Sequence, residues 1–212
     1  MRAMDVEPGR VSDAFAVYAL RHQRRGQWFN GGIARSPISE GSLQRTAFAL
    51  HALNRYLPPS MIEEYAAVKR QSIAWMSLAA VRTADDAAMK LIALHAAGAP
   101  TASVAQAAQA LARRQQADGG FSGNPEMAAD AYATGEALAA LAFTGQAVQH
   151  AGVVRSGAEW LRRTQQADGS WHVRSRSAKF QPYFEGGFPH GHDQWLSNAA
   201  TGWAVTALAM SE

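Results

Sequence analysis

The sequence predicts an all-α protein in which four helical hairpins follow one another in an arc. The first observation is an internal repeat: residues 111–121 (LARRQQADGGF) return 50 positions later at 161–171 (LRRTQQADGSW). The second is a set of four Ala- and Leu-rich segments that align with one another, beginning at Thr46, Ala87, Thr134 and Thr201. No segment alternates convincingly with the period of two that a half-buried strand shows. A chain of 212 residues that is 48% hydrophobic can also bury a core.

Four helices are expected to line the inside of the arc, because Ala and Gly on several faces allow close packing. Their expected ranges are 42–56, 83–98, 130–145 and 197–210. Four residues before each aligned segment stands a side chain that accepts hydrogen bonds from free amides at a helix start. These expected N-caps are Ser42, Thr83, Asp130 and Ser197.

The outer helices carry Arg, Gln and Glu on one face and larger apolar residues on the other, as helices with one solvated face should. Their expected ranges are 11–24, 60–80, 101–116 and 150–166. The longest stretch expected to lack helix, from Trp171 to Gln194, is rich in Gly and aromatic residues. A loop of that length is typical of a packed or functional segment.

Composition excludes several classes of function. The absence of cysteine excludes disulfides, thiolate zinc sites and a cysteine nucleophile. The net charge of +3 is small, and the arginine pairs are dispersed along the chain, so no nucleic-acid partner is expected. His190, His192 and Asp193 are too few for a metal site, and no phosphate-binding loop is present, so we expect no metal and no cofactor. The sequence shows neither a secretory signal nor a transmembrane run, and the cytoplasm is the default expectation.

The repeat resembles a known family. Gln165 followed by Asp168-Gly169-Ser170-Trp171 resembles the QW motif of squalene and oxidosqualene cyclases and of the wider prenyltransferase/squalene-oxidase repeat family. The copy from Gln115 ends in Phe121 instead of Trp. A Gln at the end of an outer helix can hydrogen-bond free backbone groups while the aromatic ring covers it, so we interpret these residues as structural clamps.

The resemblance implies an (α/α) toroid. The resemblance implies that full cyclases of this family contain two toroids in one chain, each with more than four hairpins. Because this sequence has only four hairpins, we expect an incomplete or small barrel. We expect residues 1–212 to form a single domain, either complete or the C-terminal part of a longer protein. Two other groups with this fold, protein prenyltransferase β-subunits and thioester-containing complement domains, need cysteine and are excluded.

The resemblance also implies a catalytic motif, Asp-x-Asp-Asp-Thr-Ala, at the start of an inner helix. The corresponding residues 83–88 read Thr-Ala-Asp-Asp-Ala-Ala, which makes Asp85 the proton donor by position and Asp86 its carboxyl neighbour. Protonating a carbon–carbon double bond requires a neutral, unusually acidic carboxyl in a dry pocket. The alternative is a capping box between Thr83 and Asp86, with Asp85 adding favourable charge at the helix start.

Cyclases of the family line their cavity with aromatic rings that stabilise carbocations. The ligand-binding candidates here are Phe48, Tyr132, Phe184, Phe188, Trp195 and Trp203, with packing in the core as the alternative role. The expected function is a squalene- or terpene-cyclase-like domain with a concave apolar cavity for an isoprenoid or another elongated apolar ligand. The alternative is a non-catalytic binding or assembly module.

The last predicted helix lacks a polar hairpin to cover it, although it carries Trp203, Val205, Leu208 and Met210. Repeat arrays need a polar face at each end. We therefore expect a homodimer or a missing N-terminal partner segment, and peripheral contact with a membrane stays open.

Overall fold

The computed structural model describes residues 7–29, 35–38, 41–178 and 182–211. These residues form eight α-helices and two short 3-10 helices, and the predicted all-α class is confirmed. The α-helices are α1 (Arg10–Arg21), α2 (Gly41–Tyr56), α3 (Ile62–Leu78), α4 (Ala84–Ala97), α5 (Thr101–Ala112), α6 (Ala131–Phe143), α7 (Ala151–Thr164) and α8 (Gln194–Ala209). The 3-10 helices are η1 (Pro59–Met61) and η2 (Gly191–Asp193).

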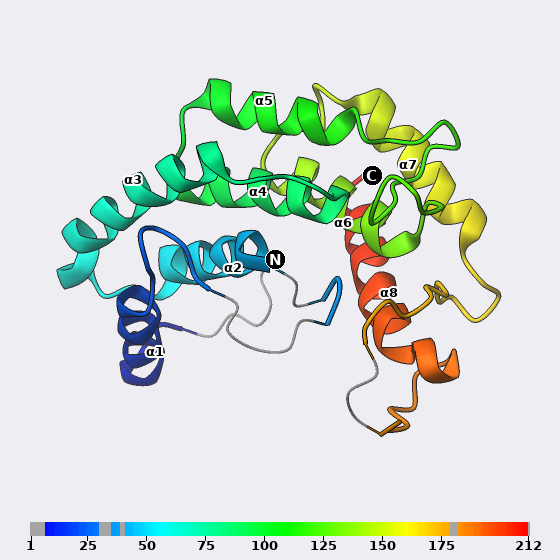
Figure 1. Ribbon diagram of the computed structural model, residues 1–212, viewed down its shortest axis with the longest axis horizontal. Coiled ribbons are helices and arrows are strands. Elements are labelled where there is room, and N and C mark those ends of the chain that lie inside the picture. The colour runs from blue at the N-terminus through cyan, green and yellow to red at the C-terminus, as the bar shows by residue number, and fades with distance from the viewer. Residues whose placement is uncertain (1–6, 30–34, 39–40, 179–181, 212) are drawn as a thin grey trace.

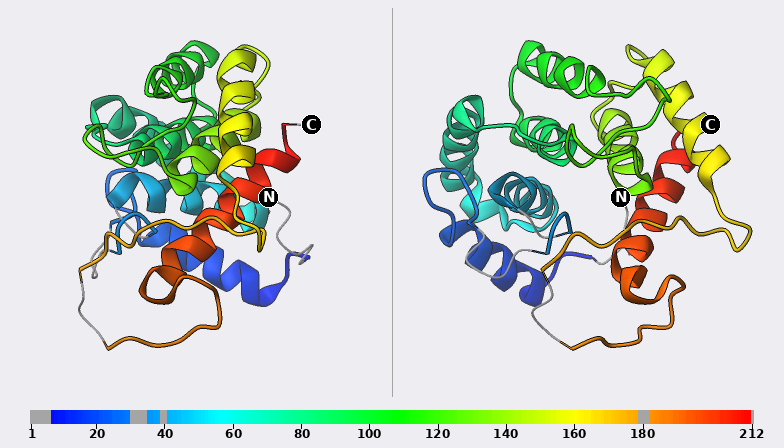
Figure 2. Two further views of the ribbon diagram at one scale, coloured as in Figure 1. Left: turned by 90° about the vertical axis from the view of Figure 1, so that its right-hand side faces the viewer. Right: turned by 45° about the vertical axis from the view of Figure 1, so that its right-hand side comes forward.

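Inner and outer helices alternate along the chain, as predicted, in an arc of the (α/α) toroid type. The inner helices pack in the order α2, α4, α6 and α8, which places α2 and α8 at the two ends of the row (Figure 1). On the outside, α1 packs on α2, α3 and α5 pack on α4, and α7 packs on α6 (Figure 2). No helix within the described ranges combines the length and apolarity needed to cross a bilayer.

Two of the four predicted N-caps are confirmed. Thr83 precedes α4, and its hydroxyl accepts a hydrogen bond from the N–H of Asp86 at 2.9 Å. Asp130 precedes α6, and its carboxylate accepts one from the N–H of Ala133 at 2.9 Å. Both inner helices of the central pair therefore begin where their polar side chains predict.

The other two N-caps were wrong. α8 begins earlier than predicted, directly after η2, so Ser197 lies inside the helix. Its hydroxyl accepts a hydrogen bond from the N–H of Val173 at 3.1 Å and so ties α8 to the segment before it. Ser42 lies inside α2, which begins at Gly41.

The inner helices approach one another closely through small residues. A Cβ atom at Gly135 of α6 would lie 2.6 Å from the backbone nitrogen of Ala204 in α8. Ala137, Ala140 and Ala207 are also buried in the core of these two helices. The expectation that Ala and Gly bring the inner helices together is confirmed.

In both copies of the repeated turn, the glutamine side chain donates hydrogen bonds to backbone carbonyl groups. The side-chain amide of Gln115 donates to the carbonyl oxygen of Gly119 at 2.8 Å and to that of Val153 in α7 at 2.9 Å. In the later copy, the amide of Gln165 donates to the carbonyl of Gly169 at 2.9 Å, within the turn itself. The predicted clamp therefore reaches the next outer helix in the first copy, whereas the bond made by Gln165 stays within its own turn.

The aromatic residue that ends each turn joins it to the next inner helix. Trp171 is almost fully buried, and its backbone N–H donates to the hydroxyl of Thr201 in α8 at 3.1 Å. The backbone N–H of Phe121 donates to the hydroxyl of Thr134 at 2.9 Å in the same way. The Thr that opens the aligned segments therefore has a structural role in these two repeats.

The segment between α7 and α8 extends towards the other end of the arc. The hydroxyl of Ser177 donates to the carbonyl oxygen of Ser36 at 3.3 Å, a contact between residues 141 positions apart. The segment before α8 thus meets the segment before α2.

Candidate functional site

Asp85 lies in the first turn of α4, on the side that faces α6. The residue as a whole is partly exposed, but its Oδ1 atom is shielded from solvent and has no hydrogen-bond partner. Burial raises the pKa of Asp85 to about 7, an effect that Arg176 opposes and the charge of Asp130 reinforces. A neutral carboxyl at this position therefore persists near neutral pH.

Glu136 is a second buried carboxyl at the same place. It lies on α6 with no exposed surface, and neither of its oxygens makes a hydrogen bond of regular geometry. Burial raises its pKa well above the ordinary value, and the neighbouring charge of Asp85 raises the pKa further. Asp85 raises the pKa of Glu136, whereas a hydrogen-bonding interaction with Glu136 lowers the pKa of Asp85, so the two carboxyls titrate as a coupled pair.

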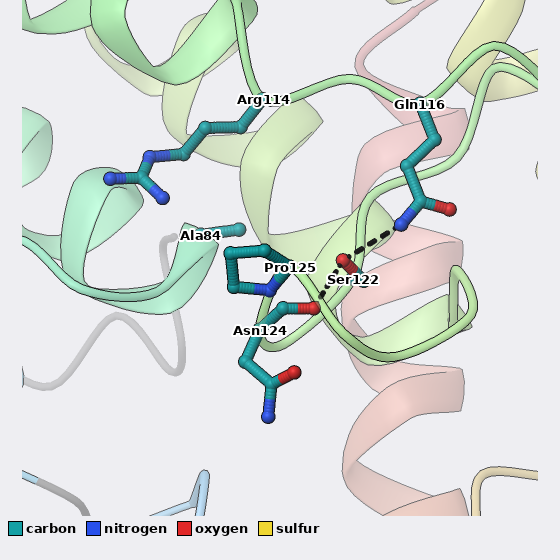
Figure 3. A pocket seen from close by; sticks show the side chains of 6 residues that line it. All are labelled: Ala84, Arg114, Gln116, Ser122, Asn124 and Pro125. Carbon is teal, nitrogen blue, oxygen red and sulfur yellow. Dashed lines mark hydrogen bonds between the residues drawn. The ribbon is translucent and has the colours of Figure 1, made fainter.

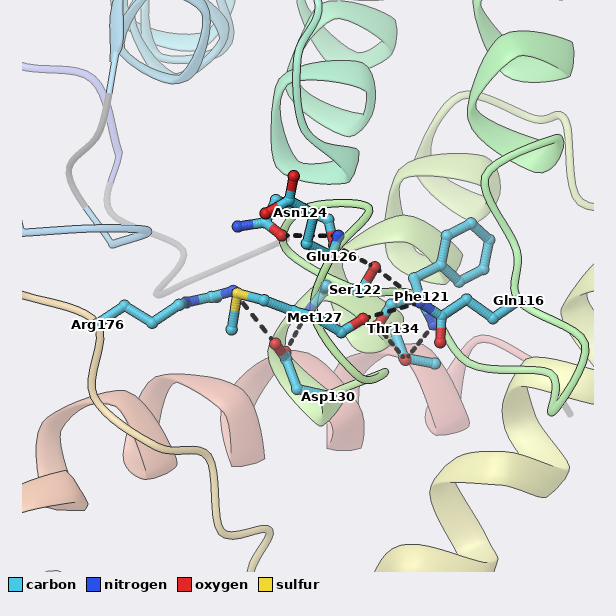
Figure 4. A network of polar contacts seen from close by, with 10 residues as sticks. Gln116, Phe121, Ser122, Asn124, Glu126, Met127, Asp130, Thr134 and Arg176 are labelled. Atoms are coloured by element: carbon cyan, nitrogen blue, oxygen red, sulfur yellow. Dashed lines mark hydrogen bonds and ion pairs between the residues drawn. The ribbon is translucent and has the colours of Figure 1, made fainter.

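An ion pair completes this acidic cluster of Asp85, Asp130, Glu136 and Arg176. Nη1 of Arg176 lies 3.3 Å from Oδ2 of Asp130, and the side chains are only 15% and 13% exposed. Figure 4 shows Arg176 extending from the segment between α7 and α8 towards Met127 and Asp130. Burial raises the pKa of Asp130, whereas Arg176 and the N–H of Ala133 lower it.

Two of the predicted aromatic residues, Tyr132 and Trp203, lie beside this cluster. Tyr132 is almost fully buried and precedes Glu136 by one turn of α6, so the two side chains share a helix face. Burial raises the pKa of Tyr132, and the charges of Glu136 and Asp85 raise it further. The indole N–H of Trp203, on α8, faces the phenol and lowers its pKa.

Asp86 has a different environment from Asp85. Its Oδ2 accepts hydrogen bonds from the N–H groups of Arg82 at 2.9 Å and Thr83 at 3.3 Å. With the reciprocal bond from the Asp86 N–H to the Thr83 hydroxyl, this is the capping box that the sequence offered as the alternative. The alternative is confirmed for Thr83 and Asp86, whereas Asp85 has no such partner.

The other four aromatic candidates do not enclose the buried carboxyls. Phe48, Trp195 and Phe184 are 45%, 51% and 66% exposed, which places much of each ring in solvent. Phe188 is partly buried and lies edge-on to the ring of His190, with 6.3 Å between ring centroids. Sequence spacing could not reveal which aromatic side chains face the cluster.

Two hollows flank the start of α4. The first has a volume of about 210 Å³ and lies between α4 and the segment after α5 (Figure 3), lined by Ala84, Arg114, Gln116, Ser122, Asn124 and Pro125. The second, of about 310 Å³, lies on the side of α2 and α3, lined by Ser42, Leu43, Trp75, Ala79, Ala80, Arg82 and Asp86. Neither is lined by Tyr132 or Trp203, so the apolar cavity stays a prediction.

The histidines before α8 form local contacts. Nε2 of His172 lies 2.8 Å from Oδ2 of Asp193, and Nε2 of His190 lies 2.8 Å from the hydroxyl of Ser170. Across the described residues, no three His, Asp or Glu side chains are arranged to hold a metal ion. These contacts hold the segment against the turn at Ser170.

Sequence reasoning assigned Asp130 only as an N-cap and missed Glu136 and Arg176. Glu136 carries a signal, because it is a lone charged residue in an otherwise small and apolar inner helix. Arg176 carries no such signal, since its position depends on the path of an irregular segment.

A search of curated proteins gives no match for this chain. The model of the family described as the squalene-hopene cyclase C-terminal domain matches residues 77–212, which include all four residues of the acidic cluster. The chain belongs to the squalene-hopene cyclase C-terminal domain family.

Proposed function

We propose that this protein binds an elongated isoprenoid and starts its cyclisation by protonation, with Asp85 as the proton donor. The observation that carries the proposal is the pairing of Asp85 with Glu136. A carboxyl with a pKa of about 7 in a position shielded from water is protonated in a large fraction of molecules at neutral pH. Membership of the family supports the same reaction class.

In the proposed step, the O–H bond of Asp85 breaks and a C–H bond forms at one alkene carbon. The π electrons supply the new bond, which leaves a carbocation on the other carbon and a carboxylate on Asp85. Arg176 stabilises that carboxylate, because its charge favours the ionised form of Asp85. Ring closure and loss of a proton from the product cation then complete an isomerisation with no net oxidation or reduction.

Tyr132 and Trp203 are the proposed aromatic partners of the cation. Their rings belong to neighbouring inner helices, α6 and α8, and both lie beside the acidic cluster. An aromatic face attracts a cation within about 6 Å by roughly 0.5 to 2 kcal/mol, more strongly where water is excluded. The exposed aromatic candidates have no such advantage, because water competes for the cation.

The second candidate function is a binding or assembly module without catalysis. The small size of the two hollows and the exposure of Phe48, Phe184 and Trp195 favour it. A carbocation needs a site from which water is excluded. A module that only binds an apolar ligand does not need a site from which water is excluded.

Incubation with squalene or geranylgeranyl diphosphate, followed by gas chromatography and mass spectrometry, tests the two candidates. We expect cyclic products from the parent and none from Asp85→Asn, with ligand affinity, followed by tryptophan fluorescence, nearly unchanged. Glu64→Gln, an exposed carboxyl on α3, is the matched control and should retain full product. Ligand binding by the parent without any cyclic product would reject catalysis and favour the module.

A further inference from the structure

Arg176 is the cation of the acidic cluster, and the family resemblance assigns it no role. We infer that Arg176 is a positioning residue for the proton donor: its guanidinium is the counter-ion that allows three carboxyls to share one buried site. The inference rests on the proposed function in so far as Asp85 is the acid. It concerns a residue that acts on Asp85 both directly and through Asp130, and that need not touch the substrate.

The first argument is electrostatic. Asp85, Asp130 and Glu136 reach the contact between α4 and α6, where burial makes each negative charge costly. Arg176 is the cation with the largest effect on both Asp85 and Asp130. Its ion pair with Asp130 favours the charged form of that carboxyl and offsets part of the effect of that charge on Asp85.

The second argument is that the guanidinium group fits closely against the segment before α6. A Cβ atom at Gly123 would lie only 1.7 Å from Nη1 of Arg176, so the missing side chain provides the space that the guanidinium occupies. The same nitrogen lies 3.7 Å from the sulfur of Met127 and 3.3 Å from Oδ2 of Asp130. The segment from 123 to 130 is therefore shaped around the guanidinium.

The third argument is what Arg176 does not do. Its Nε and Nη2 atoms are buried and have no hydrogen-bond partner. The position is better explained by the charge that the guanidinium brings to the carboxyls. The charge acts on Asp85 of α4 and on Asp130 at the start of α6. The other titratable groups that act on these two carboxyls or lie beside them are Asp86, Tyr132 and Glu136.

Replacing Arg176 with Gln should make Asp85 a weaker acid. Without the cation, the charge of Asp130 is uncompensated, so Asp85 keeps its proton to a pH about one unit higher. The alkaline limb of the pH profile of kcat/KM should therefore shift to higher pH by about one unit. The value of kcat should fall about tenfold, while KM changes little. Arg176→Lys should return the limb towards that of the parent, because it restores the charge.

The deciding measurement follows the Asp carboxyl carbons by NMR from pH 4 to 9, with Asp85→Asn used to assign the signal of Asp85. This titration needs no substrate. We expect the Asp85 midpoint to rise in Arg176→Gln and to stay in place in Arg174→Gln, an exposed arginine of the same segment. An unchanged Asp85 midpoint in folded Arg176→Gln would overturn the inference, whether or not the parent forms cyclic products.

The double variant Asp130→Asn/Arg176→Gln serves as a second test in case Arg176→Gln alone does not fold. It replaces the ion pair by two neutral amides of similar shape, so no unpaired charge is left buried. We expect the Asp85 midpoint in this variant to lie near that of the parent, because both charges are removed together. A midpoint as high as in Arg176→Gln alone would contradict a role that acts through Asp130. If the parent makes no product but the midpoints move as described, the proposed function fails while the counter-ion assignment stands.

Discussion

Replacement of Asp85 by Asn should flatten the pH dependence of the protein's stability between about pH 4 and 7. In the folded protein the pKa of Asp85 is about 7 instead of its ordinary 3.8, because burial disfavours the charged form. In this pH range the folded state therefore binds more protons than the unfolded state, and stability falls as the pH rises. Asn has no proton to lose, so the variant lacks this contribution.

The size of the effect follows from the two pKa values. A carboxyl that titrates near 7 when folded and at 3.8 when unfolded destabilises the folded state by at most about 4 kcal/mol above pH 7. The contribution is absent below about pH 4, where both states are protonated, and it grows through the folded pKa. The free energy of unfolding of Asp85→Asn, relative to the parent, should therefore increase from pH 4 to pH 8.

Urea unfolding followed by circular dichroism at intervals from pH 4 to 8 measures this difference. Glu64→Gln is the control, and its curve should run close to that of the parent because its side chain is exposed. The reasoning would be refuted if parent and Asp85→Asn curves stayed parallel over the whole range, since Asp85 would then titrate alike in the folded and unfolded chains.

Two further predictions concern packing and association. Gly135→Ala should lower stability by about 1 to 3 kcal/mol, because the new methyl group would meet the backbone of α8 at 2.6 Å; Gly152→Ala, on α7 with open space around it, should instead raise stability by about 0.4 to 1 kcal/mol in the same thermal melt. Equal effects of the two substitutions would show that α6 and α8 are not closely packed. Val205 is 53% exposed on α8, and we expect the protein to associate through this face, with Val205→Lys shifting light scattering at micromolar concentration towards the monomer. A parent that is already monomeric and binds no apolar dye would contradict this expectation.

Much of the fold was predictable because local sequence signals specify each hairpin and recur in all four hairpins. The repeat shows which helices are equivalent, and the high content of small residues distinguishes the inner helices from the outer ones. The error at Ser197 has a local cause: η2 turns the chain before Gln194, so α8 starts three residues ahead of the position that the alignment suggested. An irregular segment of this kind has no period from which its end can be read.

The site was predictable only in part. Asp85 was found through its place in a recognisable motif, and the capping box gave the role of Asp86. Arg176 lies 46 positions beyond Asp130 in sequence and reaches it only because the segment between α7 and α8 returns to the start of α6. The four aromatic candidates away from the cluster have the right composition, but their exposure depends on neighbours that sequence spacing does not specify.

The contact between Ser177 and Ser36 has a consequence for the order of folding. The helices of the arc pack on helices that lie one or two places away along the chain, so hairpins of this kind can form one after another. A contact across 141 residues instead requires the two ends of the arc to be in place, and such distant contacts form slowly. Because Arg176 directly precedes Ser177, we expect the carboxyls to receive their counter-ion at the same late stage. A chain whose arc is still incomplete would thus hold its carboxyls before it holds their cation, and the acid would acquire its final strength only when folding is finished.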